Sequence, residues 1–535
     1  MDNLTRRSVL QMMPGAALAS QAGANPGTRF ADVVVYGGTA AGVIAAVQVS
    51  RLGKRVLLLA PERQVGGISV DGLGASDINN HWFQNDYAVG GLAREFYLRV
   101  GRKYGSAAPV YRFESSVAES VFEDLLREAS VAIVRGVRLR EPLPSAVDWG
   151  GQVKRVRAIR MESGETFSGS IFIDATMEGD LLAAARITTA SGREGNSLYG
   201  ETTNGIRGVN DFHQFTERVD PYRIPGDPSS GLIPTIKDES LGEPGAADRR
   251  IMGFGFRLCL TRETSNHLPI GKPSGYDPGL YEVYRRYALA GGKLPFPAAR
   301  LPNGKTDLNG GLYGMNHDWP EGSYATRKRI FDEHKQFTHG LVWFMANDPK
   351  LPESVRSEWR GWGLCQDEFS DNNGWPRQLY VRCGRRLVSD YMITEHHTLS
   401  INPEPVADPV AVAFWPPDLH AVRCIVRDGA AYNEGYVFHT KGWGPFGISY
   451  RALTPREDQA LNILTPTCPS SSYVAYGAIR LEWTFMALGQ AAATAAATAL
   501  EQQCAVQAIK YKTLKERLLK DDQVLTLNLV PAIEK

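Results

Sequence analysis

A glycine-rich turn near the start of the chain has the residue types that bind a diphosphate. Residues 33–42 read VVVYGGTAAG, in which Gly37 permits a tight turn out of a strand and Gly42 lets a helix pack closely. The free backbone N–H groups at the start of that helix can hold a pyrophosphate. Thr39 stands where a second glycine is usual, and its hydroxyl can itself donate to phosphate. The turn predicts a cofactor site made of Gly37, Gly38, Thr39, Ala40, Ala41 and Gly42.

Two histidine clusters have residue types suited to proton transfer. In Asp418-Leu419-His420 the acid and the imidazole lie on one side of an extended chain, because side chains alternate with period two. The carboxylate can then orient the ring and raise its basicity. The second cluster, Glu395-His396-His397, offers His397 as a base or substrate ligand. The catalytic candidates are therefore His420, His397 and Asp418, with a structurally bonded role as the alternative for each histidine.

Three arginines offer a binding site for a substrate carboxylate, and the spacing of the cysteines argues against a metal site or disulfides. Arg382, Arg385 and Arg386 can bind a substrate carboxylate in bidentate fashion or tie parts of the fold together. The six cysteines lie far apart in the sequence, with no CxxC pair and no histidine at metal-ligand spacing. The sequence therefore predicts neither a metal site nor a disulfide scaffold.

The elements around the glycine turn form a strand, turn, helix and strand unit of about thirty residues. An apolar strand over 32–36 leads into the turn, an alanine-rich helix spans 43–52, and a second strand covers 55–59. The acid that usually binds a ribose ends the second strand, where this chain has Ala60. Glu62 is the nearest carboxylate for that role, and a solvated loop charge is its alternative. After Arg63, the pair Gly66-Gly67 lets the chain pass close to a flat ring system.

Composition and charge narrow the class of protein. The chain has 535 residues, 43% of them hydrophobic, which suits a soluble globular protein of two or three domains. Its formal charge of +1 and the absence of a long basic block argue against nucleic-acid binding. No apolar run reaches the roughly 18 residues that a membrane span needs.

The first 24 residues have the pattern of an export signal. Thr5-Arg6-Arg7-Ser8-Val9-Leu10-Gln11 resembles a twin-arginine signal, and Ala22-Gly23-Ala24 offers a small-residue cleavage site. The pattern predicts a periplasmic or secreted mature protein, with a chance pair of arginines as the alternative.

Motifs along most of the chain resemble one flavoprotein family. The chain resembles a family of FAD-dependent oxidoreductases that carries the label xanthan lyase-like in some annotations. That family is related to the two-dinucleotide-binding-domain flavoproteins, which include fumarate reductase and aspartate oxidase. The motifs are YGGTAAGVIAA, APERQVGGISVDGLGASD, GGLAREFYLRV, IFIDATMEGDLLAAA, SGREGNSLYGE, DPYRIPGDPSSGLIP, FRLCLT, LPNGKTDLN, QLYVRCGRRLVSDYMIT and NILTPTCPSSSYVAYGAIRLEWTFMALGQAAATAA. This resemblance selects FAD over NAD.

The resemblance implies an α/β fold with a Rossmann-like FAD-binding domain of the glutathione-reductase type and an inserted α+β substrate domain. The implied divisions are the signal at 1–24, the FAD-binding domain at 30–200, a substrate region at 201–455, a returning FAD-binding part at 456–510 and a tail at 511–535. Val137 is expected to contact the adenine, and the strand ending in Asp174-Ala175 to close the FAD domain. Ser470 precedes a long helix, expected from about Ala478 to Gln502, that begins under the flavin.

These expectations define a function. The chain is expected to be an exported FAD-dependent oxidoreductase that oxidises a sugar, polyol or hydroxy acid by hydride transfer to flavin N5, with oxygen, a quinone or a cytochrome as electron acceptor. One alternative is a carbohydrate-processing lyase or binding protein in which FAD is structural or absent. Another is a flavin reductase of an activated C=C bond.

Overall fold

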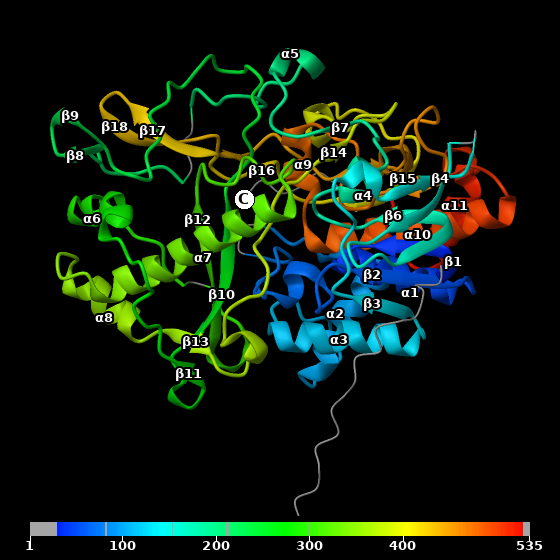
Figure 1. The fold of residues 1–535 in the computed structure, drawn as a ribbon, viewed down its shortest axis with the longest axis horizontal. Helices are drawn as coiled ribbons and strands as arrows, with labels where there is room; N and C mark the ends of the chain where they lie inside the picture. Colours follow the sequence, from blue (N-terminus) through cyan, green and yellow to red (C-terminus); the bar gives the residue numbers. More distant parts are fainter. Residues whose placement is uncertain (1–28, 81–82, 152–153, 210–212, 298, 528–535) are drawn as a thin grey trace, which may run out of the picture.

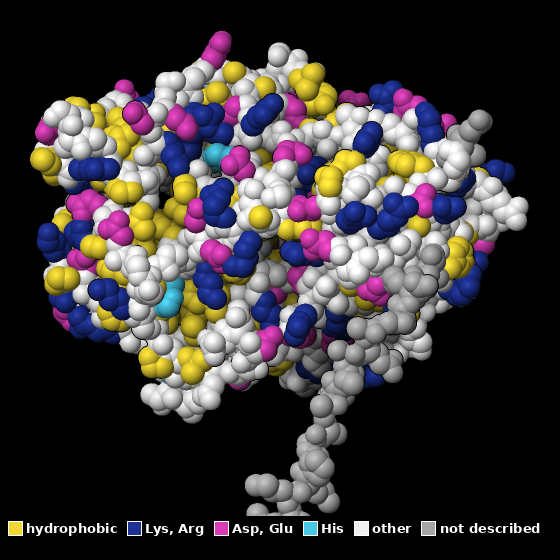
Figure 2. Space-filling view, viewed as in Figure 1, with side chains coloured by type: hydrophobic (Ala, Val, Ile, Leu, Met, Phe, Trp, Pro, Cys, Tyr) yellow, Lys and Arg dark blue, Asp and Glu magenta, His cyan; other side chains and the backbone are white. Residues whose placement is uncertain are grey.

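The computed structural model describes residues 29–80, 83–151, 154–209, 213–297 and 299–527. The predicted export signal lies outside these residues. Figure 1 shows two lobes side by side, one built on a largely parallel sheet and the other on an antiparallel sheet crossed by a long helix. Acidic and basic side chains are interspersed over the face in Figure 2, in keeping with the near-zero net charge. No described helix is both long enough and apolar enough to cross a membrane.

The first lobe is organised by a seven-stranded sheet of order β3-β2-β1-β6-β5-β4, with β21 beside the end of β6. Strands β1, β2, β3, β6 and β21 are parallel, whereas β5 and β4 form an antiparallel edge. Val33, Val34 and Val35 at the centre are fully buried, as expected where both faces of a parallel sheet are covered. The strands are β1 Arg29–Tyr36, β2 Val56–Ala60, β3 Ala132–Arg135, β4 Val147–Trp149, β5 Val156–Arg160, β6 Thr166–Asp174 and β21 Ile463–Leu464. The predicted Rossmann-like α/β fold is confirmed.

Two alanine-rich helices from opposite ends of the chain pack together against this sheet. Helix α1 (Ala40–Arg51) and helix α10 (Glu482–Gln502) approach so closely that a Cβ added at Gly489 would lie 2.4 Å from the Ala41 carbonyl oxygen. The single helix expected from Ala478 is instead two, α9 (Tyr473–Ile479) and α10, because the extended Leu481 interrupts it. Helices α2 (Gly91–Lys103) and α3 (Ser115–Glu128) complete this layer.

The second lobe holds a four-stranded antiparallel sheet of order β11-β13-β10-β12, on which helix α7 (Tyr324–Asn347) packs. Its strands are β10 Phe254–Thr261, β11 His267–Leu268, β12 Lys305–Leu312 and β13 Gly363–Cys365. Nearby helices and hairpins are α6 Glu282–Leu289, α8 Glu353–Arg360, β8 Tyr222–Ile224 with β9 Asp227–Leu232, and β17 Arg423–Arg427 with β18 Ala430–Glu434. This is the mixed α+β region expected between the cofactor-binding segments; its exact boundaries stay a prediction.

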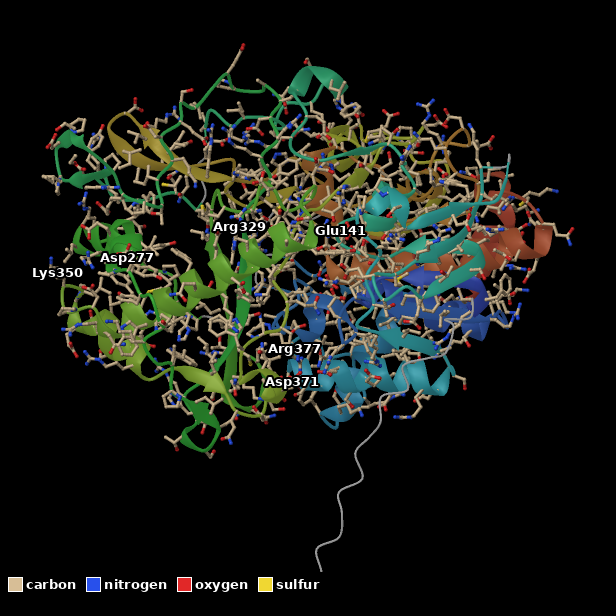
Figure 3. The ribbon with its side chains drawn as sticks, in the orientation of Figure 1. Glu141, Asp277, Arg329, Lys350, Asp371 and Arg377 are labelled. Atoms are coloured by element: carbon tan, nitrogen blue, oxygen red, sulfur yellow. The ribbon has the colours of Figure 1, made fainter. Side chains whose placement is uncertain are left out.

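Shorter elements complete the fold. They are α4 Asp180–Ala184, α5 Asn196–Tyr199, α11 Tyr511–Lys520, and the strand pairs β7 Thr189–Ala190 with β14 Arg386–Leu387, β15 Pro409–Ala413 with β20 Phe446–Ser449, and β16 Asp418–Leu419 with β19 Val437–Phe438. Buried Asp180 at the start of α4 accepts two hydrogen bonds from Arg327 of α7, at 2.7 and 2.8 Å. Figure 3 shows Asp371 and Arg377 together at the junction, where they are hydrogen-bonded at 2.9 Å. The Asp180–Arg327 pair therefore joins α4 to α7, whereas the Asp371–Arg377 pair holds one local segment together.

Thr39 is the N-cap of α1. Its Oγ1 accepts a hydrogen bond from the Gly42 amide at 3.2 Å and donates one to the Ala175 carbonyl oxygen at 2.7 Å. The residue is in an extended conformation with φ −66°, so this position does not require glycine. The hydroxyl therefore joins α1 to the end of β6, and its proton is directed to the backbone and not to a phosphate.

The Thr39→Ala variant should lose about 1 kcal/mol of unfolding free energy, because the helix loses its cap and the Ala175 carbonyl its partner. Chemical denaturation measures this change. The matched control is Thr39→Ser, which keeps the hydroxyl and should retain most of the stability. Equal stabilities for the alanine and serine variants would show that the cap contributes nothing.

Candidate functional site

A cavity of about 260 Å³ opens at the carboxyl ends of β1 and β2. The glycine turn forms one wall, and residues from α7 and from the segment 377–381 form the opposite wall. Gly37 has φ +120°, and a Cβ there would lie 2.4 Å from the Ala175 carbonyl carbon. The lining residues are Tyr36, Gly37, Gly38, Thr39, Pro61, Glu62, Gly67, Ile68, Arg138, Thr176, Met177, Glu178, Asp180, Trp319, Tyr324, Arg327, Lys328, Phe331, Arg377, Gln378, Leu379, Tyr380, Val381 and Glu482.

The predicted glycine-turn residues divide between the cavity wall and the packing behind it. Gly37, Gly38, Thr39, Glu62 and Gly67 line the cavity. Ala40, Ala41 and Gly42 are buried in the first turn of α1, directly behind the wall. Gly66 has a packing role, because a Cβ there would lie 2.6 Å from atoms of Phe122 and Val70. Arg63 is exposed beside the cavity, and its carbonyl oxygen accepts a hydrogen bond from Arg135 at 2.8 Å.

Asp174 is fully buried and caps helix α4. Its carboxylate accepts hydrogen bonds from the Thr176 hydroxyl and amide and from the amides of Leu181 and Leu182, at 2.7 to 3.1 Å. Burial raises the pKa of Asp174 to about 6, against which these hydrogen bonds act. Asp174 does not line the cavity; its neighbour Ala175 contributes through its backbone contacts with Thr39 and Gly37. The pair therefore shapes the cofactor turn from behind.

Val137 and Ser470 are not part of the cavity lining. The Val137 side chain is buried in an apolar cluster, and its amide donates to the Ala60 carbonyl oxygen at 3.1 Å, while the next residue, Arg138, faces the cavity. The Ser470 hydroxyl accepts a hydrogen bond from the Ser389 amide at 3.1 Å. Neither side chain lines the cavity. A role for either in binding the cofactor stays a prediction.

Glu62, which follows strand β2, is the acidic residue among the predicted cofactor-binding residues that line the cavity. Its side chain is exposed toward that space but surrounded by protein, and Glu178, Asp71 and Asp180 lie near enough to repel its charge. Desolvation, followed by the charge of Glu178, raises the pKa of Glu62 to about 7. A carboxyl group in this position gains from a ligand that donates hydrogen bonds to its ionised form.

The wall fits the dinucleotide that the resemblance implies. The N-cap of α1 lines the cavity, which brings the positive end of the helix dipole to it. Glu62 stands two residues beyond β2, close to the place where a ribose-binding acid is found. The far wall contains residues that the sequence did not single out: Arg138, Trp319, Tyr324, Arg327 and Tyr380. They come from segments far from the glycine turn along the chain, since Tyr380 is 343 positions after Gly37, so no local pattern marked them.

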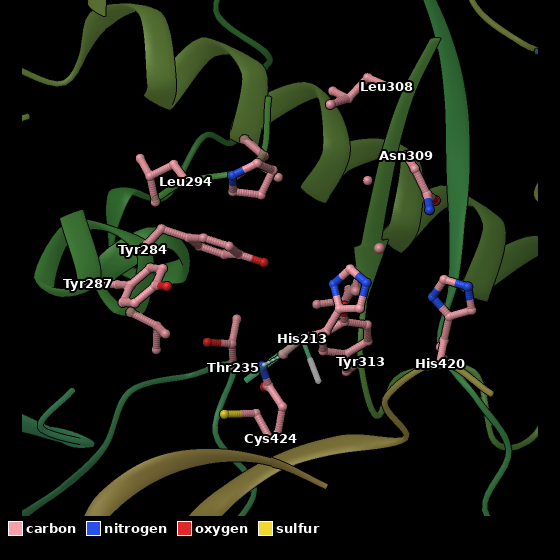
Figure 4. A pocket seen from close by; sticks show the side chains of 18 of the residues that line it. His213, Thr235, Tyr284, Tyr287, Leu294, Leu308, Asn309, Tyr313, His420 and Cys424 are labelled. Carbon is pink, nitrogen blue, oxygen red and sulfur yellow. Dashed lines mark hydrogen bonds between the residues drawn. The ribbon is translucent and has the colours of Figure 1, made fainter. Parts of the chain in front are cut away.

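A second cavity, of about 440 Å³, lies beside the first. Arg382 lines it, whereas the preceding Tyr380 and Val381 line the first cavity, so one short segment borders both. Figure 4 shows the rings of His213 and His420 directed into this space near Asn309 and Tyr313, with Tyr284, Tyr287 and Leu294 at the other end. The arrangement provides polar groups near the first cavity and an apolar end farther away.

His420 is in this cavity, but its expected partner is not bound to it. Asp418 forms an ion pair with Arg480 at 3.0 Å and accepts a hydrogen bond from Trp415 at 3.3 Å. Burial and the charges of Arg382 and Arg480 lower the pKa of His420 well below its usual value. The expectation that Asp418 raises the basicity of His420 is therefore wrong, because Asp418 is paired with Arg480, and burial and the nearby arginines lower the pKa of the histidine. His420 is neutral at pH 7 and can accept a proton.

His397 is a structural residue. Its Nδ1 lies 3.1 Å from the Thr394 amide, which donates to it, and its Nε2 lies 2.9 Å from the Tyr391 hydroxyl. Together with Thr394 it closes a capping box, and it lines neither cavity. The structurally bonded alternative describes this histidine.

The three neighbouring arginines have different surroundings. Arg385 forms ion pairs with Asp180 and Glu321, and Arg386 forms one with Glu194 at 2.6 Å, so both tie segments together. Arg382 alone lines a cavity, where its guanidinium lies 4.2 Å from the centre of the Tyr380 ring.

Comparison with known proteins identifies the family. The family described as FAD dependent oxidoreductase matches residues 32–518. No curated protein sequence matches the chain. Similar solved structures include a flavin monooxygenase mutant from Stenotrophomonas maltophilia, with 16% identity, a TM-score of 0.18, and coverage of 28% of this chain and 38% of that one.

Two further solved structures have similarly limited overlap. An L-amino acid deaminase from Proteus myxofaciens has 11% identity, a TM-score of 0.21, and coverage of 30% of this chain and 48% of that one. A thioredoxin reductase from T. acidophilum has 19% identity, a TM-score of 0.18, and coverage of 32% and 40%. The match spans less than half the length of each of these three proteins. The family match, which covers most of the chain, favours redox chemistry over a lyase or a binding protein without FAD. The chain belongs to the FAD dependent oxidoreductase family, and FAD is its cofactor.

Proposed function

We propose that this oxidoreductase oxidises a small polar substrate, such as a sugar, polyol or hydroxy acid, in the second cavity. The observation that carries the proposal is the segment Tyr380 to Arg382, which borders the first cavity on one side and the cavity of His420 on the other. A substrate in the second cavity is thereby next to the cofactor site. When bound, FAD supplies a hydride acceptor at N5 of its ring.

In the first cavity, backbone groups of the glycine turn and the side chain of Glu62 would hold FAD. The turn from Gly37 to Thr39 presents the start of α1 to the diphosphate, and the Glu62 carboxylate would accept hydrogen bonds from the ribose hydroxyls. Trp319 and Tyr324 also line the cavity and would shield the bound cofactor from water.

His420 would accept the proton of the substrate hydroxyl. Its lowered pKa keeps a ring nitrogen free of a proton at pH 7, and Arg382 and Arg480 favour that neutral form. Oxidation of an alcohol removes a hydride from carbon and a proton from oxygen, so the pair of acceptors balances the reaction.

An anaerobic screen of sugars, polyols and hydroxy acids tests the proposal. A substrate should bleach the visible absorbance of the oxidised flavin without any added reductant. If no compound reduces the flavin but reduced enzyme is reoxidised by activated alkenes, the protein is instead a reductase of C=C bonds. Reoxidation by oxygen, a quinone or a cytochrome then identifies the electron acceptor.

The Glu62→Ala variant should bind FAD about tenfold more weakly, the effect of losing hydrogen bonds to a charged group. Fluorescence titration of apoprotein with FAD measures this affinity.

Because only the ionised carboxylate accepts both hydroxyl hydrogen bonds, the affinity of the wild-type protein for FAD should rise as pH increases through about 7, the pKa of Glu62. Glu62→Gln should abolish that rise, and Arg63→Ala, which changes an exposed residue outside the cavity, should have wild-type affinity. An unchanged affinity in Glu62→Ala would exclude the acid from the site.

The His420→Gln variant should bind FAD normally but slow flavin reduction by substrate about 100-fold, the size of a lost general base. Stopped-flow absorbance under anaerobic conditions measures the rate. His396→Gln is the control, because His396 contacts the Tyr199 carbonyl oxygen and lines neither cavity. Since the pKa of His420 lies well below 6.5, the wild-type rate should not fall between pH 8 and pH 6.5. A variant with the wild-type rate would remove His420 from the mechanism.

We also propose that the protein is exported through the twin-arginine route, on the strength of Arg6-Arg7 and the small residues at 22–24. Replacing both arginines by lysine should keep the protein in the cytoplasm. Cell fractionation with sequencing of the mature N-terminus measures the outcome, and unchanged distribution of the variant contradicts export by this route.

A further inference from the structure

The second cavity is bordered by Arg382, an arginine that has no acidic partner among the described residues. Three arginines, Arg257, Arg382 and Arg480, lie close to one another beside it. Arg480 is paired with Asp418 at 3.0 Å and Arg257 with Asp307 at 3.5 Å. Among the residues that the structure describes, no carboxylate lies within 4.0 Å of the Arg382 guanidinium.

The protein satisfies Arg382 only in part. Its Nε donates to the Gly253 carbonyl oxygen at 3.1 Å, and its Nη2 donates to Asn309 Oδ1 at 2.6 Å. Both acceptors are neutral. Its Nη1 donates to no other described atom, although the side chain is only 3% exposed and lines the cavity. The guanidinium is thus oriented by neutral groups and keeps hydrogen-bonding capacity on the cavity side.

A buried cation without a counter-ion is energetically costly. Burial, together with the charges of Arg480 and Arg257, lowers the pKa of Arg382 to about 10, so it still carries its charge at pH 7. An anion entering the cavity would relieve both the repulsion and the missing hydrogen bonds. A carboxylate suits this role, because its two oxygens match the geometry of a guanidinium.

The opposite end of the cavity is lined mostly by aromatic and aliphatic side chains, with Lys293 beside Leu294 as a charged residue in the lining. Tyr284, Tyr287 and Leu294 lie there in Figure 4, and Phe337 and Leu341 of α7 add to the same lining. A ligand that fills the cavity therefore needs an anionic group at one end and an apolar group at the other.

We infer that the substrate is a carboxylate with an apolar side chain, held by Arg382 through its carboxylate, and not a neutral sugar or polyol. Among the proposed substrates this selects a hydroxy acid whose hydroxyl is placed near His420. The inference rests on the proposed function, since both place the substrate in the second cavity.

Phenylacetate and phenylacetamide test the charge preference. They have similar shape, differ in charge, and lack the hydroxyl group that would be oxidised, so their binding is measured without turnover. Isothermal titration calorimetry of the oxidised holoenzyme should give phenylacetate an affinity at least about tenfold higher than that of the amide. Equal affinities, or no binding of the acid, overturn the inference.

Variants of Arg382 assign the preference to one side chain. Arg382→Gln should remove the difference between acid and amide, and Arg382→Lys should keep part of it through its charge. Arg218→Gln is the matched control, because Arg218 is exposed, donates to the Asp428 and Gly429 carbonyl oxygens, and lines neither cavity. Persistence of the acid preference in Arg382→Gln contradicts the assignment. If that variant does not fold, Arg382→Lys and the wild-type comparison still decide.

The anion site and the proposed oxidation can be tested independently of each other. Preference for the acid without flavin bleaching by any hydroxy acid supports the anion site and rejects the oxidation. Bleaching by neutral polyols, with equal binding of acid and amide, supports the oxidation and rejects the anion site.

Discussion

The close approach of three chain segments at the end of β1 determines the cofactor cavity. Gly37 leaves room for the Ala175 carbonyl, where a Cβ would lie 2.4 Å away, and the Thr39 hydroxyl donates to that carbonyl oxygen. The end of β1, the start of α1 and the end of β6 are thereby held together. Because the same hydroxyl also caps α1, the helix begins at the cavity wall, and its positive end would face the diphosphate of FAD.

Buried charges then hold the second lobe against this turn. Asp180 follows β6 closely in sequence and binds both Arg327 of α7 and Arg385, while Glu178 accepts a hydrogen bond from Trp319 at 3.0 Å. Losing one partner of such a group leaves an uncompensated buried charge, a change that typically costs about 3 to 5 kcal/mol. The pairs therefore fix the wall formed by α7, which encloses the cofactor site from the side that the Rossmann-like lobe leaves open.

The sequence predicted the parts of the site that depend on local structure. Gly37 and Glu62 were predictable because a strand, turn, helix and strand unit places them just after the carboxyl ends of the neighbouring parallel strands β1 and β2. Asp174 could not be distinguished from a cofactor ligand, because its role depends on the amides of Leu181 and Leu182 in the turn that follows. The spacing of Asp418 and His420 was informative about the side of the chain they share, but Arg480, sixty-two positions away from Asp418, decides which group the acid binds.

The charge of Arg382 affects both the binding of a carboxylate and the pKa of His420. An acidic partner for Arg382 would neutralise the cavity and raise the pKa of the histidine, whereas the partial satisfaction of Arg382 by Asn309 and a backbone carbonyl leaves its charge in place. Burial and that charge lower the pKa of His420 and so keep the ring unprotonated at pH 7. A carboxylate bound to Arg382 would reduce this effect and so make His420 a stronger base when substrate is present. Binding of an anion and activation of the base are thus linked through the same electrostatic field.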